Sequence, residues 1–146
     1  MELDGALSAK LTAYARADAP DEACGLLLGR SVGERAIVER APRLRNHAAD
    51  RRRAFLIDPA DIVRADAEAA REGLALVGVW HSHPGGEHEL SARDRAAAWP
   101  GHVQLLIAIA ASGTVTCAAW VRRDGHLRPV RLVAAPVGVA PAGARH

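Results

Sequence analysis

The segment of residues 81–94, HSHPGGEHELSARD, constrains this chain more than any other part of it. It follows an apolar run at residues 74–80, LALVGVW, which is predicted to be a buried strand. Residues two apart on a strand share one face, so His81 and His83 are predicted to project together, with Ser82 turned the other way. Pro84 has no backbone N–H for a sheet, and the strand is therefore expected to end there.

A carboxylate returns to the same region from the helix predicted for residues 92–99. Asp94 lies in the first turn of that helix. Two histidines and one aspartate are a ligand set typical of catalytic zinc, which keeps a fourth position open for water. A simpler interpretation of Ser91 and Asp94 is a helix cap, with serine at the N-cap and an acidic residue three positions on. The His-x-His pair and the Ser-x-x-Asp pair, joined by a short loop with glycines, together favour the metal site.

The pattern His-Ser-His-Pro, six residues and Ser-x-x-Asp resembles the signature of the JAMM (MPN+) zinc metallopeptidases. These enzymes cleave isopeptide or peptide bonds at the C-terminus of ubiquitin and ubiquitin-like proteins. Three further segments resemble small bacterial members of the family: PDEACGLLLG at residues 20–29, FLIDP at 55–59 and AAAWPG at 96–101. The resemblance covers most of residues 20–120. Leu90 departs from it, because the family commonly has proline before the serine; this departure concerns the rigidity of the loop rather than the ligands.

Amide hydrolysis needs a polarised carbonyl, an activated water and a proton for the leaving amine. Zinc supplies the first two, and a glutamate can carry the proton. The residues alone do not choose among Glu22, Glu87 and Glu89. The resemblance implies Glu22 as this acid and base. It also implies that Ser91 donates a hydrogen bond to the oxyanion, an interaction typically worth about 3 to 4 kcal/mol.

Composition is that of one globular domain, predicted for residues 1–133. The 146 residues are 49% hydrophobic and 25% charged, enough for a core that folds alone. Residues 134–146, rich in Pro, Gly and Ala, are expected to form a disordered tail. The N-terminal segment lacks the features of a signal peptide, and no apolar run approaches a membrane span, so we expect a cytoplasmic protein without a membrane partner. A net charge of +2 gives no reason to expect nucleic acid.

Periodicity and turn residues predict an α/β fold with a mixed central sheet flanked by helices, similar to the layered JAMM/MPN and cytidine-deaminase architecture. Helices are expected at residues 3–18, 58–73 and 92–99. Strands are expected at residues 24–28, 35–39, 54–57, 74–80, 103–110, 114–122 and 127–133, the last three antiparallel. The order of strand 54–57, helix 58–73 and strand 74–80 predicts a right-handed crossover between parallel neighbours.

Several other residues carry weaker expectations. Cys24 and Cys117 are expected to be reduced core thiols. Trp80, Trp99 and Trp120 are expected to pack in the core. The arginine-rich residues 42–53 are either a solvated loop or a docking surface for an acidic protein partner.

The resemblance implies a metallopeptidase that hydrolyses the amide bond after the C-terminal Gly-Gly of a ubiquitin-like or sulfur-carrier protein. Related small enzymes release an amino acid such as cysteine, in sulfur transfer and cysteine biosynthesis, and this chain lacks room for the long insertions that grip ubiquitin chains. The alternative is a non-catalytic MPN-type scaffold, although such proteins usually lack part of the ligand set. A zinc deaminase would need His-x-Glu followed by Pro-Cys-x-x-Cys, and neither is present. The sequence gives no oligomeric state.

Overall fold

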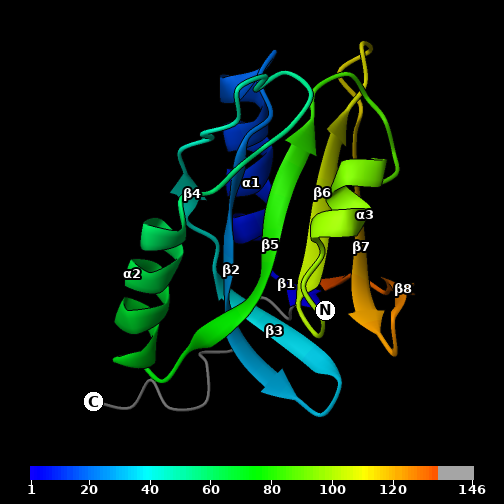
Figure 1. Ribbon diagram of the computed structural model, residues 1–146. Coiled ribbons are helices and arrows are strands. Elements are labelled where there is room, and N and C mark those ends of the chain that lie inside the picture. The colour runs from blue at the N-terminus through cyan, green and yellow to red at the C-terminus, as the bar shows by residue number, and fades with distance from the viewer. Residues whose placement is uncertain (135–146) are drawn as a thin grey trace.

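The computed structural model describes residues 1–134, which form nine strands and three helices (Figure 1). The elements in chain order are β1 (Glu2–Leu3), α1 (Gly5–Asp18), β2 (Cys24–Val32), β3 (Arg35–Arg40), β4 (Arg43–Leu44), α2 (Pro59–Ala70), β5 (Ala75–His83), α3 (Ala92–Ala97), β6 (Val103–Ile109), β7 (Val115–Arg123), β8 (His126–Val130) and β9 (Val133–Ala134). Of the predicted tail, Ala134 belongs to β9, and the remainder lies outside the described residues.

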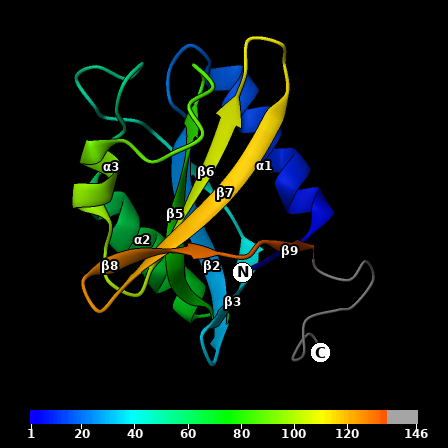
Figure 2. The same ribbon diagram turned by 90° about the vertical axis from the view of Figure 1, so that its right-hand side faces the viewer.

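One mixed sheet runs through the structure in the order β8-β7-β6-β5-β2-β3-β1-β9, with β4 also paired to β2. The central strand β5 is antiparallel to β2 and parallel to β6. Helix α1 covers one face of the sheet, and α2 and α3 cover the other (Figure 2). The prediction of a mixed sheet flanked by helices is therefore confirmed, as is the antiparallel arrangement of β6, β7 and β8.

The predicted strand at residues 54–57 is wrong. The segment is extended but does not join the sheet, because β2 already pairs with β5 on one side and with β3 and β4 on the other. It is held by Asn46 and His47 instead: the His47 N–H donates to the Leu56 carbonyl at 2.8 Å, and the Leu56 N–H donates to Asn46 Oδ1 at 3.1 Å. The predicted crossover through α2 fails with it, and a helical connection between parallel neighbours is found instead from β5 through α3 to β6.

Capping residues fix where the first two helices begin. Asp4 caps α1 by accepting a hydrogen bond from the Leu7 N–H at 2.7 Å, so the helix begins at Gly5 rather than at residue 3. Leu3 lies instead in β1, which pairs with β3 and β9. Asp58 caps α2, with Pro59 at its first position, as the sequence predicts.

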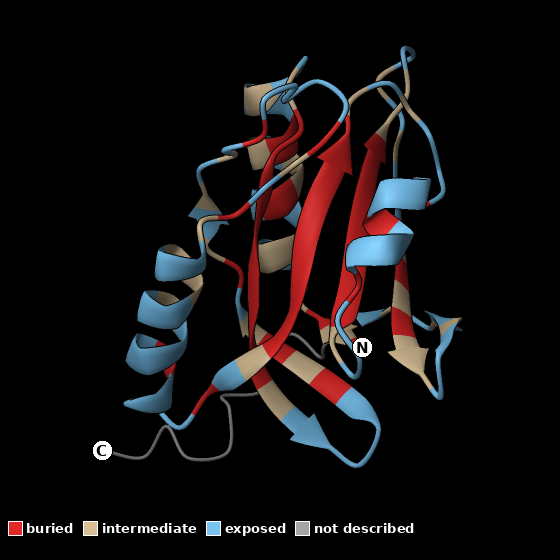
Figure 3. Ribbon diagram, viewed as in Figure 1, coloured by how far each residue is buried: buried red, intermediate tan, exposed pale blue. Residues whose placement is uncertain are grey.

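The core has two layers, one on each face of the sheet. Strands β2, β5 and β6 are buried along most of their length, because helices cover both faces there (Figure 3). Leu27, Trp80 and Leu105 pack beneath α1, and Trp80 stacks on Tyr14 with ring centroids 6.1 Å apart. Leu26 and Val79 pack towards α2. These three strands form the rigid base from which the loop of residues 84–91 departs.

Three of the expected core residues are less buried than predicted. Trp99 is 39% exposed and Trp120 is only half-buried, whereas Trp80 is fully buried as expected. Cys117 is exposed, because α1 packs on β6 and leaves this part of β7 uncovered. Cys24 is buried, and both thiols are free. Within residues 1–134, the helices are too short or too polar to cross a bilayer.

Gly25 provides a test of this packing. A Cβ atom there would lie 2.0 Å from the Pro42 carbonyl oxygen and 2.5 Å from Trp80 Nε1, two atoms that share a hydrogen bond of 3.3 Å. We expect Gly25→Ala to lower the free energy of unfolding by about 3 kcal/mol or more, because backbone would have to move. Gly5→Ala is the matched control, since nothing lies within 4 Å of its added methyl. Equal urea-unfolding midpoints for the two variants would contradict this account.

Candidate metal centre

The end of β5 presents two imidazoles to one point. His81 and His83 project from the same face of the strand, and their Nε2 atoms lie 3.3 Å apart. Ser82 points away and accepts a hydrogen bond from the Ala23 N–H at 2.8 Å. His81 is fully buried and His83 almost so. The strand ends at His83, before Pro84, as predicted.

Asp94 approaches the histidines from the first turn of α3. Its Oδ2 atom lies 3.1 Å from His81 Nε2 and 3.2 Å from His83 Nε2. The same oxygen accepts a hydrogen bond from the Ser91 N–H at 2.9 Å, while Ser91 Oγ accepts one from the Asp94 N–H at 3.0 Å. The capping box and the approach to the histidines therefore coexist, and the cap orients the oxygen that faces them.

The three atoms fit a tetrahedral metal. With bonds of 2.0 to 2.1 Å, as between zinc and imidazole nitrogen, neighbouring ligands of a tetrahedral ion are about 3.3 to 3.4 Å apart. The observed separations are 3.1, 3.2 and 3.3 Å. A carboxylate oxygen and two imidazole nitrogens are also ligands that zinc accepts. His81, His83 and Asp94 could thus hold one metal ion with one position left for another ligand.

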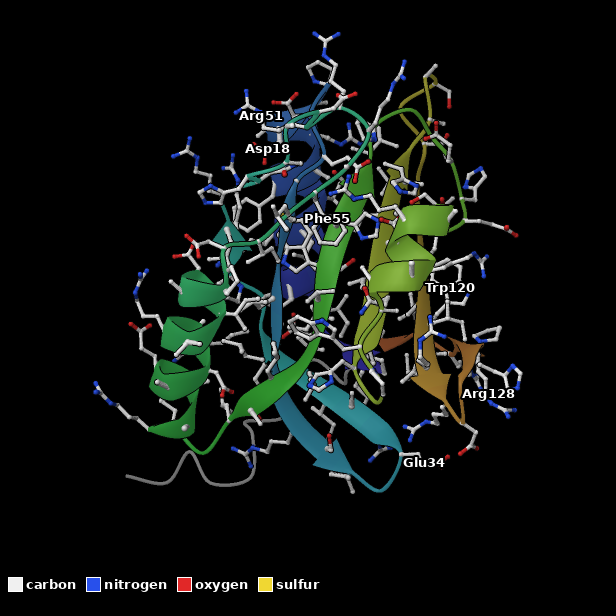
Figure 4. All side chains as sticks on the ribbon, in the orientation of Figure 1. Asp18, Glu34, Arg51, Phe55, Trp120 and Arg128 are labelled. Carbon is white, nitrogen blue, oxygen red and sulfur yellow. The ribbon has the colours of Figure 1, made fainter. Side chains whose placement is uncertain are left out.

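Neighbouring groups orient both rings. His83 Nδ1 donates to the Glu87 carbonyl at 3.0 Å, which leaves Nε2 as the unprotonated, ligating nitrogen of the neutral ring. The ring of Phe55 stacks on His81 with centroids 4.5 Å apart, in front of β5 (Figure 4). Among the described residues, His81 Nδ1 has no hydrogen-bond partner. Neither Phe55 nor the Glu87 carbonyl belongs to the ligand pattern, so neither was predicted at the site, although Phe55 begins the FLIDP segment that resembles the family.

Glu22 comes to the same place from the start of β2. It is 5% exposed, and its carboxylate lies with the ligating atoms of His81 and His83 in a group whose members are within 4.8 Å of one another. Its Oε1 atom is buried without a hydrogen-bond partner among residues 1–134. Glu87 and Glu89 are exposed on the loop. Geometry therefore favours Glu22 over the other two as a group acting beside the metal position.

Electrostatics differ for the acidic groups and the histidines. Burial raises the pKa of Glu22 to about 7, an effect that His83 opposes. Burial acts in the same direction on Asp94, but hydrogen bonds from His81 and His83 outweigh it and hold the pKa of Asp94 well below its usual range. Burial lowers the pKa of His81. Burial acts in the same direction on His83, but its hydrogen bonds with Asp94 and the Glu87 carbonyl outweigh it and raise the pKa of His83. An ionised Asp94 and a neutral His81 are the forms that bind a metal.

Cys24 is no rival nucleophile, although β-sheet pairing places it opposite His81. Burial raises the pKa of its thiol to about 12, and its Sγ faces the Leu44 carbonyl at 3.7 Å. The reactive thiolate is therefore strongly disfavoured.

Two hollows flank the site. The larger, of about 840 Å³, is lined by Glu22, His83 and Ser91, and by the charged residues Arg52, Arg53, Glu87 and Glu89. We call it the charged groove. The smaller, of about 170 Å³, borders Asp94 and is mainly apolar; its lining includes Phe55, Leu56, Ala97 and Trp99. The partial exposure of Trp99 is explained by its position on this second hollow.

Helix α3 has only six residues, and contacts outside it hold it in place. Arg122 donates through Nε to the Ala98 carbonyl at 3.2 Å and through a terminal nitrogen to the Arg95 carbonyl. Arg95 Nε donates in turn to the Leu90 carbonyl at 3.3 Å. Leu90 is 4% exposed, so a buried side chain anchors the loop where proline is common in the JAMM family. No local sequence pattern links Arg122 to α3.

Comparisons with known proteins identify the family of this chain. Residues 5–134 match the family model described as prokaryotic homologs of the JAB domain. A desampylase of Haloferax volcanii is 36% identical over 107 residues, which cover 73% of this chain and 74% of the relative. A probable TtuB-protein conjugate cleaving protease of Thermus thermophilus is 39% identical over 83 residues, 56% of this chain and 53% of that protein.

Solved structures show the same architecture. A solution structure from Desulfitobacterium hafniense superposes with a TM-score of 0.82 at 28% identity, covering 92% of both chains. A second, from Salinibacter ruber, gives 0.68 at 27% identity and covers 97% of this chain and 94% of its own. A JAB1/MPN domain protein from Archaeoglobus fulgidus gives 0.55 at 18% identity, covering 91% and 97%, and supports the fold alone.

The raised pKa of Glu22 predicts a pH dependence of stability in the metal-free protein. The pKa of the Glu22 carboxyl is about 7 in the folded protein and 4.5 in the unfolded chain, so between these pH values the folded protein binds more protons. The free energy of unfolding therefore falls as the pH rises from about 4.5 to about 7. Glu22→Gln removes this loss. Relative to the wild type, we expect the variant to gain about 3 kcal/mol in free energy of unfolding between pH 4 and pH 8.

The measurement is urea unfolding across that range in the presence of a chelator. Glu34→Gln, in the exposed turn between β2 and β3, is the control. A difference between Glu22→Gln and the wild type that stays constant with pH would show that the Glu22 carboxyl is not held in its neutral form.

Proposed function

The chain belongs to the family of prokaryotic homologues of the JAB domain, and we propose from this premise that it is a zinc-dependent peptidase. Its proposed reaction is hydrolysis of the amide bond after the C-terminal Gly-Gly of a ubiquitin-like or sulfur-carrier protein. The observation that carries the proposal is the convergence of His81 Nε2, His83 Nε2 and Asp94 Oδ2 within 3.3 Å of one another, beside a buried glutamate.

Zinc is the proposed metal, with His81, His83 and Asp94 as its ligands. Bound there, zinc would polarise the scissile carbonyl and lower the pKa of water. The Glu87 carbonyl fixes the tautomer of His83, and Phe55 restricts the ring of His81. The capping box holds Asp94 Oδ2 toward both rings. These contacts preorganise the ligands before a metal arrives.

Glu22 is the proposed acid and base. Its carboxyl accepts a proton from the attacking water and returns it to the leaving nitrogen, so that the amine departs neutral. Its position beside the two histidines supports this role, because from there the carboxylate can reach both the attacking water and the leaving nitrogen. The buried Oε1 atom, which has no partner among residues 1–134, is available for this proton.

Ser91 is the proposed donor to the oxyanion. Its Oγ accepts the Asp94 N–H, which leaves the hydroxyl proton free to donate. Ser91 lines the charged groove together with Glu22 and His83. A hydrogen bond from this hydroxyl to the tetrahedral intermediate would stabilise the transition state by about 3 to 4 kcal/mol.

The proposed substrate class rests on the relatives. One is named a desampylase and the other a protease that cleaves TtuB–protein conjugates, and both names describe the removal of a conjugated protein. The charged groove borders Glu22, His83 and Ser91, and the apolar hollow borders Asp94, so a carrier tail and the leaving group can occupy one each. We propose an amino acid such as cysteine as the released group, which would connect the enzyme with sulfur transfer.

Metal binding separates this proposal from the scaffold alternative. We expect wild-type protein to bind one zinc per chain and Asp94→Ala to lose it or hold it at least about tenfold more weakly. Asp4→Ala is the matched control, because it removes the corresponding cap of α1 far from the site. Zinc retained after equilibrium dialysis, measured by mass spectrometry, gives the result. Full occupancy in Asp94→Ala would remove Asp94 from the ligands, and an absence of zinc in wild type would favour a scaffold.

Hydrolysis tests the role of Glu22. Zinc-loaded Glu22→Gln should keep its metal and lose activity on a carrier–cysteine conjugate by at least about 10²-fold, because the proton carrier is gone. Intact mass spectrometry of the carrier follows the loss of one cysteine. Glu87→Gln and Glu89→Gln test the two other glutamates, and a comparable loss in either of them alone would assign the base to the loop.

A further inference from the structure

The charged groove is lined by side chains of both charges from two loops. Arg52 and Arg53 come from the segment between β4 and α2, and Glu87 and Glu89 come from the segment between β5 and α3; Glu22 lines the same groove. The groove's volume of about 840 Å³ is more than a water molecule or a bare amine requires. The groove is therefore shaped to receive a group larger than the reacting atoms themselves.

The arginines of residues 43–53 do not form one cationic surface. Arg43 pairs with Asp18, and Arg51 pairs with Asp21 at 3.3 Å. The Arg53 guanidinium lies 3.9 Å from Asp50, at the limit of an ion pair, with its side chain 86% exposed. Within residues 1–134, the side chain of Arg52 has no ion-pair partner. Within the same described residues Arg45 also has no ion-pair partner, but it lines a separate hollow together with Asp18 and Asp21. The positive charge that this loop contributes to the charged groove is therefore that of Arg52 and Arg53.

Backbone hydrogen bonds fix the segment of Arg52 and Arg53 beside Glu22. The Glu22 N–H donates to the Arg51 carbonyl at 2.7 Å, directly before Arg52. The Arg53 N–H donates to the Asp50 carbonyl at 3.2 Å, and Asn46 Nδ2 donates to the carbonyls of Glu22 and Ala54 at 3.0 Å each. The side chains of Arg52 and Arg53 are exposed, but their backbone is held by hydrogen bonds next to Glu22, the proposed proton carrier.

The position of Glu22 decides which part of a substrate meets these arginines. The glutamate must reach the leaving nitrogen to protonate it, within about 3 Å. The group attached to that nitrogen then occupies the charged groove next to Glu22. The carrier tail lies on the other side of the scissile bond.

We propose that Arg52 and Arg53 bind a carboxylate of the leaving group, and that the enzyme therefore prefers conjugates of an amino acid joined through its α-amine. This inference rests on the proposed function. An α-carboxylate is separated from the scissile nitrogen by a single carbon, so it enters the groove with that nitrogen. Guanidinium groups bind carboxylates through paired, charge-assisted hydrogen bonds. Glu89 is paired with Arg95 at 3.7 Å, whereas Glu87, which also lines the groove, repels a carboxylate and so favours its binding at the arginines.

The reaction that follows is balanced without another reactant. Water adds its oxygen to the terminal glycine carbonyl carbon, the C–N bond breaks, and the nitrogen takes up the proton carried by Glu22. The products are the carrier with a free glycine carboxylate and the amino acid with a free amine. The carboxylate bound by the arginines is unchanged throughout, so these residues act on specificity rather than on the chemical step.

Two conjugates that differ in one group test the proposal. A carrier ending in Gly-Gly-Ala with a free carboxylate is compared with the same carrier ending in Gly-Gly-alaninamide. The enzymes are zinc-loaded wild type, the double variant Arg52→Gln/Arg53→Gln, and Arg128→Gln. Arg128 is exposed on β8, at the opposite end of the molecule from Arg51 (Figure 4), so its change controls for the loss of a surface charge.

Wild type and Arg128→Gln should cleave the acid about tenfold faster than the amide, as expected for a charge-assisted hydrogen bond at a partly exposed site. The double variant should lose this ratio, with the acid slowed about tenfold and the amide changed by less than about twofold. In the Glu22→Gln background, the same preference should appear in the dissociation constants of the uncleaved conjugates. It should weaken as salt rises.

The possible outcomes distinguish a failure of the carboxylate site from a failure of the proposed peptidase function. Equal cleavage of both conjugates by wild type would overturn the carboxylate site and leave the peptidase standing. If the double variant keeps the preference for the acid over the amide, the proposal is also overturned, because another group would then bind the carboxylate. If zinc-loaded wild type cleaves neither conjugate and Glu22→Gln binds neither, the proposed function fails as well.

Discussion

The antiparallel pairing of β2 with β5 brings the parts of the site together. Cys24 lies opposite His81, and the contact continues beyond β2, where the Ser82 N–H donates to the Ala23 carbonyl at 3.0 Å and Ser82 Oγ accepts the Ala23 N–H. These bonds fix the chain next to Glu22 against the strand end that carries both histidines. A shift of one residue in this register would turn the histidines or the glutamate to the other face. The proposed proton carrier and the proposed metal position therefore depend on one stretch of sheet.

A second constraint falls on a single oxygen atom. Asp94 Oδ2 accepts the Ser91 N–H and lies against both histidines, so the cap of α3 and the metal position share it. A six-residue helix is too short to be stable alone. Its position comes from the cap at its start and from Arg122 at its end. The sheet thus supplies two of the proposed ligands, and a small helix anchored at both ends supplies the third.

Local patterns in the sequence predicted local structure well. Because successive side chains of a strand point to opposite faces, His81 and His83 were predicted on one face, and Pro84 was predicted to end the strand. Asp58 and Ser91 were recognised as the caps at which two helices begin. Features that depend on the pairing of segments far apart in the sequence could not be predicted from local patterns. Glu22 could be chosen over Glu87 and Glu89 only by resemblance, because its proximity to the histidines arises from sheet register. Residues 54–57 looked like a strand, and only the full occupation of both edges of β2 excludes them from the sheet. The exposure of Cys117 depends likewise on where α1 packs, which no local pattern records.

The site also carries a cost that the surrounding core must offset. Glu22 Oε1 and His81 Nδ1 are buried without partners among residues 1–134, and an unsatisfied buried polar atom typically costs about 1 to 3 kcal/mol. Such groups are uncommon in a core selected for stability alone. Both atoms lie at the ends of the most buried strands of the sheet. The densely packed core beneath them holds them in place and away from the water that would otherwise form hydrogen bonds with them. A buried carboxyl with a pKa of about 7 and imidazoles held close together are unfavourable features of the empty fold. They become favourable when a cation occupies the point on which they converge, and a strained arrangement of this kind is expected at a functional site rather than in a structural core.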